Sequence, residues 1–154
     1  MNFERDFRHL LVNYIPLADL VGDRVSWSEL PAARPRPLIV LWNVTRDTPP
    51  TMDARTGYAA AYLQVDCWGD TYDDARAAAD EISGFLQTLQ DVVDGDTRFQ
   101  GVFLQGRQDG NEPALGSPAA RYFRVRIDCT VHWSAVTVYL VGENSEDVLG
   151  STVP

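Results

Sequence analysis

The segment YLQVDCWGDTYDDARAAADEISGFLQTL, residues 62–89, contains a strand followed directly by a helix. Between Tyr62 and Trp68 the side chains alternate in character, which predicts a half-buried strand because successive strand residues point to opposite faces. Beyond Gly69, apolar residues recur at intervals of three and four, which predicts a helix with one buried face. These residues are Ala75, Ala78, Ala79, Ile82, Phe85, Leu86 and Leu89.

Three polar residues define the start of that helix. Thr71 is a good N-cap residue, because its hydroxyl can accept a bond from a free backbone N–H group of the first turn. Asp74 lies three residues later as the weaker partner of a capping box, and Asp73 beside it adds negative charge at the positive end of the helix dipole. Helix capping therefore accounts for the acidic residues at this turn.

The composition limits the possible functions. The chain has 154 residues, a net charge of −9 and no lysine, all 13 basic residues being arginine. The absence of lysine excludes P-loop and Schiff-base chemistry, and the acidic charge argues against a dedicated nucleic-acid binder. The apolar runs at 38–42 and 138–141 are far shorter than the ~20 residues that cross a bilayer, so we expect a protein made in the cytoplasm without a membrane segment.

The rest of the sequence predicts one α+β domain. Its mostly antiparallel mixed sheet would carry an N-terminal helix and the central helix on one face. Further helix is expected at residues 3–14 and 17–21, and strands at 25–27, 38–44, 58–68, 99–105, 123–133 and 136–141. Residues 30–37, rich in proline, predict an extended surface connection, with a ligand of SH3-type domains as the alternative. Loops are expected at 45–57 and 106–119, and a polar terminus at 142–154.

The strand at 123–133 has one packed face and one polar face. Val125, Ile127, Cys129 and Val131 alternate with Arg124, Arg126, Asp128 and Thr130. Two tripeptides have the same pattern, Val65-Asp66-Cys67 and Ile127-Asp128-Cys129. They are either an internal repeat or parts of two strands that meet the same packing requirement. In both cases Cys67 and Cys129 are expected to be buried and unpaired, since two distant cysteines make neither a disulfide framework nor a zinc site.

The hypothesis that the protein is an enzyme depends on carboxylates that could bind a metal ion. Asp66 and Asp70, with Asp73 and Asp74, are candidates to hold Mg²⁺ in a small hydrolase. Their strand and capping positions favour a structural role instead, and His9 and His132 lack a second ligand at metal-binding spacing. We therefore expect no catalytic residue, no metal and no other cofactor.

Three short segments of the chain resemble the tail-completion or tail-terminator proteins of long-tailed bacteriophages. They are Leu20-Val21-Gly22-Asp23-Arg24-Val25, the pair Leu30-Pro31 with Pro37-Leu38-Ile39-Val40, and Val65 to Ala75. The similarity covers roughly Phe3 to Trp133, which sets a domain at 1–133 and a C-terminal extension at 134–154. It implies a structural virion protein at the tail–head junction, assembled in the host cytoplasm.

The resemblance also implies partners. They are identical copies in a ring, a hexamer, with the tail tube protein on one side and a head-proximal neck or adaptor protein on the other, and DNA passing through the lumen without specific binding. The alternatives are a head-completion adaptor and, in another class, the metal-dependent hydrolase that uses Asp66 and Asp70.

Five residues are candidate protein contacts. Arg46, Asp47 and Arg55 belong to the long loop at 45–57, and connections of that length often carry function. Arg124 and Arg126 lie on the polar face of the strand at 123–133, where we expect them to pair with carboxylates of the same or a neighbouring subunit.

Overall fold

The computed structural model describes residues 3–30, 35–44, 58–114 and 117–136. In this part of the chain three helices and a six-stranded sheet form a single α+β domain. The elements are α1 (Phe3–Val12), α2 (Ile15–Val21), β1 (Val25–Trp27), β2 (Leu38–Asn43), β3 (Tyr58–Gly69), α3 (Tyr72–Leu86), β4 (Val92–Asp94), β5 (Thr97–Ala114) and β6 (Ser117–Ala135). None of the described helices is long and apolar enough to span a bilayer.

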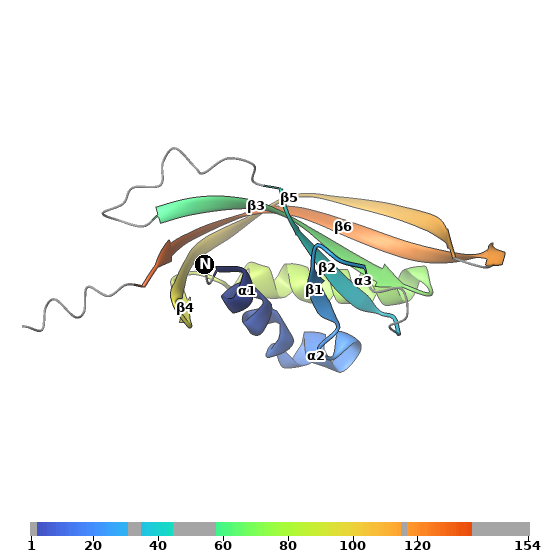
Figure 1. The fold of residues 1–154 in the computed structure, drawn as a ribbon, viewed down its shortest axis with the longest axis horizontal. Coiled ribbons are helices and arrows are strands. Elements are labelled where there is room, and N and C mark those ends of the chain that lie inside the picture. Colours follow the sequence, from blue (N-terminus) through green and yellow to red (C-terminus); the bar gives the residue numbers. More distant parts are fainter. Residues whose placement is uncertain (1–2, 31–34, 45–57, 115–116, 137–154) are drawn as a thin grey trace, which may run out of the picture.

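The sheet has the strand order β1-β2-β3-β6-β5-β4. Only β1 and β2 are parallel, and all other neighbours are antiparallel. The two longest strands, β5 and β6, form a hairpin that extends to one side of the domain (Figure 1). The sheet is therefore mixed and mostly antiparallel, in agreement with the prediction from the sequence.

The helices lie together on one face of the sheet (Figure 1). The main core lies between these two layers and contains the buried faces of α1 and α3 and the alternate residues of β3 and β6. Phe7, Leu11, Ile82 and Ile127 are among its fully buried side chains. The protein thus has two layers, and the described helices leave the second face of the sheet uncovered.

Several local predictions are confirmed. The hydroxyl oxygen of Thr71 accepts a hydrogen bond of 3.2 Å from the backbone N–H of Asp74 and caps α3. The second helix ends at Gly22, whose φ of 59° favours glycine. Cys67 and Cys129 are both free and buried, and burial raises the pKa of the Cys129 thiol to about 12 and that of Cys67 further.

The prediction of a loop at 106–119 is wrong. Residues up to Ala114 belong to β5 and those from Ser117 belong to β6, so that only the tip of the hairpin at 115–116 lies outside the described residues. Gly106 follows a register shift after Leu104, whereas Gly110 pairs with Arg124 in regular register, and a further shift lies between Pro113 and Ala114. Pairing along β6 therefore overrides the local preference of Gly and Pro for turns.

Two further differences concern short elements. Strand β4, Val92–Asp94, was not expected, because the sequence there was interpreted only as a turn at Asp94 and Gly95. The strand predicted at 136–141 falls almost wholly outside the described residues, although the backbone N–H of Val136 still bonds the carbonyl of Asp96 at 2.8 Å. The proline-rich stretch is described only from residue 35 onward.

Asp6 attaches α1 to the turn between β4 and β5. Its buried carboxylate accepts bonds from the Thr97 hydroxyl at 2.7 Å and the Asp96 backbone N–H at 3.0 Å, and it forms an ion pair with Arg5. Burial by itself would raise the pKa of Asp6, but these hydrogen bonds outweigh it and lower that pKa. At Gly95, φ is +60° and a Cβ would collide with the same carboxylate, so the turn requires glycine.

Candidate docking surfaces

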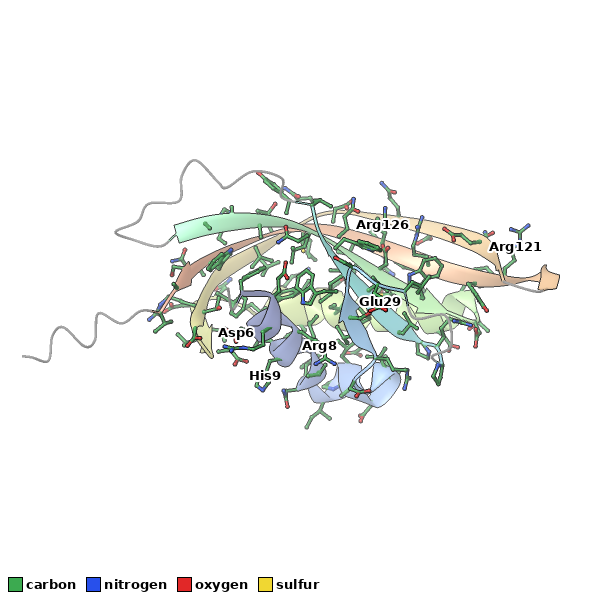
Figure 2. The ribbon with its side chains drawn as sticks, in the orientation of Figure 1. Asp6, Arg8, His9, Glu29, Arg121 and Arg126 are labelled. Atoms are coloured by element: carbon green, nitrogen blue, oxygen red, sulfur yellow. The ribbon has the colours of Figure 1, made fainter. Side chains whose placement is uncertain are left out.

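The face of the sheet away from the helices is called the open face below. The strand register places Val40, Asp66, Arg126 and Gln108 in one row across it. Figure 2 shows Arg126 on this side of the sheet, whereas Asp6, Arg8 and His9 lie on the helical side. The open face is formed by Leu38, Val40, Trp42, Tyr62, Gln64, Asp66, Trp68, Phe103, Gln108, Tyr122, Arg124, Arg126, Asp128, Thr130 and His132.

The centre of the open face is an ion pair between neighbouring strands. Arg126 donates to both carboxylate oxygens of Asp66, at 2.6 and 2.8 Å. The indole N–H of Trp42 donates to the same carboxylate at 2.9 Å. Asp66 is only 2% exposed, and its hydrogen bond raises the pKa of Arg126 above the usual value. Two charge-assisted hydrogen bonds to one carboxylate fix the position of this guanidinium.

An aromatic and arginine cluster lies beside this pair. Leu38, Val40 and Trp68 are buried there, and Trp42 and Tyr122 pack against them. The guanidinium of Arg36 lies 3.6 Å from the centre of the Tyr122 ring. These residues make a second, smaller apolar cluster on the face that the helices leave uncovered. Trp, Tyr and Arg are the residue types that dominate binding energy at protein interfaces.

Arg124 lies over this cluster with one nitrogen unsatisfied. Its guanidinium carbon is 5.6 Å from the Trp68 ring centre, and one terminal nitrogen is 3.7 Å from the Glu112 carboxylate. Its Nε is buried and has no hydrogen-bond partner among the described residues. A buried N–H donor without an acceptor costs free energy, so an incoming acceptor at this point would be stabilising.

A second row crosses the open face nearer the start of β5. Tyr62, Thr130 and Phe103 are cross-strand neighbours on β3, β6 and β5. Tyr62 is 50% exposed and Phe103 is 61% exposed, while the hydroxyl of Thr130 between them is buried and has no partner in the described part of the chain. The His132 and Phe103 rings meet at right angles with centroids 5.3 Å apart. Exposed aromatic rings on a sheet face are typical of a contact surface.

The five candidate contact residues divide into two groups. Arg124 and Arg126 lie on the open face as the alternation predicts, and the expected pairing of Arg126 with a carboxylate is found within the chain. Their contact with another protein remains a prediction. Arg46, Asp47 and Arg55 lie outside the described residues.

Asp66 and Asp70, the two carboxylates on which the hydrolase hypothesis depends most, are both engaged by arginines. Asp66 is bound by Arg126, and Asp70 accepts a bond of 2.8 Å from Arg36. His9 is paired with Asp94 at 2.8 Å. In the ranges that the structure describes, no group of three or more His, Cys, Asp or Glu side chains could hold a metal ion.

Sequence reasoning missed the aromatic residues of the open face. The available signal was the unbroken apolar run at residues 38–42, and the structure buries the first four residues of the strand Leu38–Asn43 instead of alternate ones. A strand that is apolar on both sides needs cover on both sides. That pattern would have indicated a second cluster around Trp42 and Trp68.

These features define a class: a small α+β structural subunit whose uncovered sheet face carries aromatic and arginine residues suited to protein contacts. A family profile described as Tail completion protein gp17 matches residues 8–132. The chain therefore belongs to the tail completion protein family, and its role is that of a structural tail-completion protein of a virion.

A solved structure shares the fold. It is a chain of the "Virion of native gene transfer agent (GTA) particle", with a TM-score of 0.58 and 19% sequence identity. The match covers 84% of this chain and 94% of that one. None of the curated protein sequences matches this chain at a significant level.

Proposed function

We propose that this protein is the terminator of a phage tail, a hexameric ring of identical copies that caps the tail tube and joins it to the head-proximal neck. Family membership over residues 8–132 supports a tail-completion role. The observation that carries the ring is the open face, which has a second apolar cluster, exposed aromatic rings and no described helix packed on it. Contacts between identical copies, repeated around a closed ring, are one way to cover such a surface.

The charge of the chain suits a conduit for DNA. Each copy carries a net charge of −9, and a ring adds these charges together around its opening. The ring would repel phosphates over about a Debye length, ~8 Å at physiological salt. DNA would then pass through without being held. The arginines of the open face are used in contacts within and between proteins.

The segment 45–57, which the sequence predicts to be a loop, is the proposed contact with the other virion proteins. Arg46, Asp47 and Arg55 supply both signs of charge for contacts with the tail tube protein or the neck protein. Shortening this loop is expected to leave the unfolding temperature within a few degrees of that of the wild type and to reduce the yield of infectious particles. A variant that unfolds far earlier, or one that still completes particles, contradicts this assignment.

The location of the protein tests the proposed function. Virions that contain this chain would be labelled with a gold-conjugated antibody against it and imaged by electron microscopy. We expect label at the tail–head junction, and after heads and tails are separated the protein should stay with the tails. Label that stays with the heads favours the head-completion adaptor, and label at the far end of the tail contradicts both.

A further inference from the structure

The outer edge of β5 is open over most of its length. Strand β4 pairs only with residues 97–99 of β5. From Gly101 to Ala114, no described strand pairs with β5 on the side away from β6. Backbone N–H and C=O groups on such an edge are a template for another strand.

The first part of this edge is apolar. Val102 and Leu104 pack at the margin of the main core, and Phe103 points to the open face with 61% of its surface exposed. From Gly106 onward the edge is polar and is protected by the register shift between Leu104 and Gly106 and by the charge of Arg107. Residues 101–105, with apolar side chains at 102–104, form an open edge between two register shifts, which we call the acceptor edge.

The opposite end of the sheet is protected. There the carbonyl of Val25 in β1 accepts a hydrogen bond of 2.7 Å from Arg8 of α1. The Nε–H group of Arg8 thus binds a carbonyl oxygen that an added strand would need as a hydrogen-bond acceptor. The acceptor edge has no such cover from the described residues.

The residues that follow β6 have the character of a strand. Residues 137–141 read TVYLV and alternate on two apolar faces, which suits an edge that is apolar on both sides. Five strand residues span about 17 Å, the same length as residues 101–105 of the acceptor edge. We call residues 137–141 the terminal segment.

The terminal segment is badly placed to reach the acceptor edge of its own chain. It continues from Val136, whose N–H bonds the turn between β4 and β5 at Asp96. The acceptor edge of the same chain lies on the side of β5 that faces away from β6, next to the residues of β5 that pair with β4. Reaching it would require a reversal, yet from Ala135 to Val141 the sequence has no Gly, Pro, Asn or Asp to make a turn.

We propose that the terminal segment of one copy adds as a strand to the acceptor edge of a second copy. The inference rests on the ring assembly proposed above and names the contact that would close it. Donor and acceptor are different parts of the chain, so the contact is head-to-tail and can repeat around a ring. The backbone bonds of the added strand give affinity, and the alternating apolar side chains fix its register.

Two full-length variants test each half of the contact. In the donor variant, Val138→Lys and Tyr139→Lys put charge on both faces of the terminal segment. Its control carries Val148→Lys and Leu149→Lys, the same charge change beyond Gly142. In the acceptor variant, Phe103→Lys places a charge on the apolar edge, and its control is Val93→Lys on β4, at a residue that is 49% exposed.

Sedimentation velocity over a range of concentrations gives the readout, with thermal melts to show that each variant is folded. We expect the wild type and both controls to associate alike. The donor and acceptor variants should each need at least tenfold higher concentration. An equal mixture of these two variants should give a complex of one copy of each and nothing larger, because only one donor and one acceptor remain intact.

The outcomes separate this inference from the proposed function. A donor variant that associates like the wild type overturns strand addition but leaves the ring standing. The same holds for a mixture that forms no one-to-one complex. A wild type that stays monomeric at every concentration contradicts both strand addition and the formation of a ring by the protein alone. The tail-terminator role itself is decided by the position of the protein in the virion.

Discussion

Replacing Asp66 with alanine is expected to destabilise the domain severely. The change removes the acceptor of two bonds from Arg126 and one from the Trp42 indole, at a position where the carboxylate is 2% exposed. Breaking a buried ion pair by removing one partner costs about 3–5 kcal/mol. The Arg126 side chain is 25% exposed and can recover some hydration, which places the expected loss near 3 kcal/mol.

Urea unfolding followed by tryptophan fluorescence measures this loss. At this chain length, about 3 kcal/mol corresponds to a fall in Tm of roughly 6–12 °C. Glu112→Ala is the matched control, because that carboxylate is exposed and lies 3.7 Å from Arg124, and it should change stability by less than about 0.5 kcal/mol.

A double variant distinguishes a lost ion pair from a lost residue. Replacing Asp66 with leucine and Arg126 with methionine removes both charges, and it should recover most of the stability that the alanine variant loses. If Asp66→Ala is as stable as the wild type, the pair does not hold the open face together. If the double variant is as unstable as Asp66→Ala, the reasoning about an unpaired buried charge is wrong.

Four further outcomes are expected. The pKa of Asp6 is lower in the folded protein than in the unfolded chain. Its contribution to stability is therefore complete above the usual carboxyl pKa of about 3.9 and is lost as the pH falls through the lower folded value. Between pH 5 and pH 2, the melting temperature should fall more steeply for the wild type than for Asp6→Asn. Gly95→Ala should destabilise by more than about 1 kcal/mol, since it combines a positive φ with a collision against Asp6, and Gly84→Ala, at an open helical site, is the control. Both thiols should react with a thiol reagent only as fast as the protein unfolds, because burial raises the pKa of Cys129 to about 12 and that of Cys67 further; rapid labelling of the native protein would show that they are accessible. In a mobility-shift titration at low salt, duplex DNA should not bind at micromolar protein, whereas binding that weakens steeply with salt would show phosphate contacts and a DNA-holding role.

Elements that depend on local chemistry were predictable from the sequence. The helix after Gly69 has its own start signal at Thr71 and its own apolar periodicity, and both appear in the structure. The alternation around Cys129 likewise indicated which side of β6 is buried. In these segments, neighbours in the sequence supply enough information to fix the structure.

Features that depend on distant partners were not predictable. Asp66 reads as a polar-face residue, and only its pairing with Arg126, 60 positions away, makes its burial acceptable. The stretch after Gln105 has the composition of a loop but becomes strand because β6 runs beside it. The exposed aromatic residues of the open face were likewise not predictable, because Tyr62 and Phe103 come together only through the strand register.

A reconstruction of the tail–head junction from images of intact virions tests the central claim most directly. The account predicts a ring of six copies at the end of the tail tube, into which the described domain fits with its sheet and helices intact. A junction without this chain, or one in which single copies make no contact with each other, would contradict the ring.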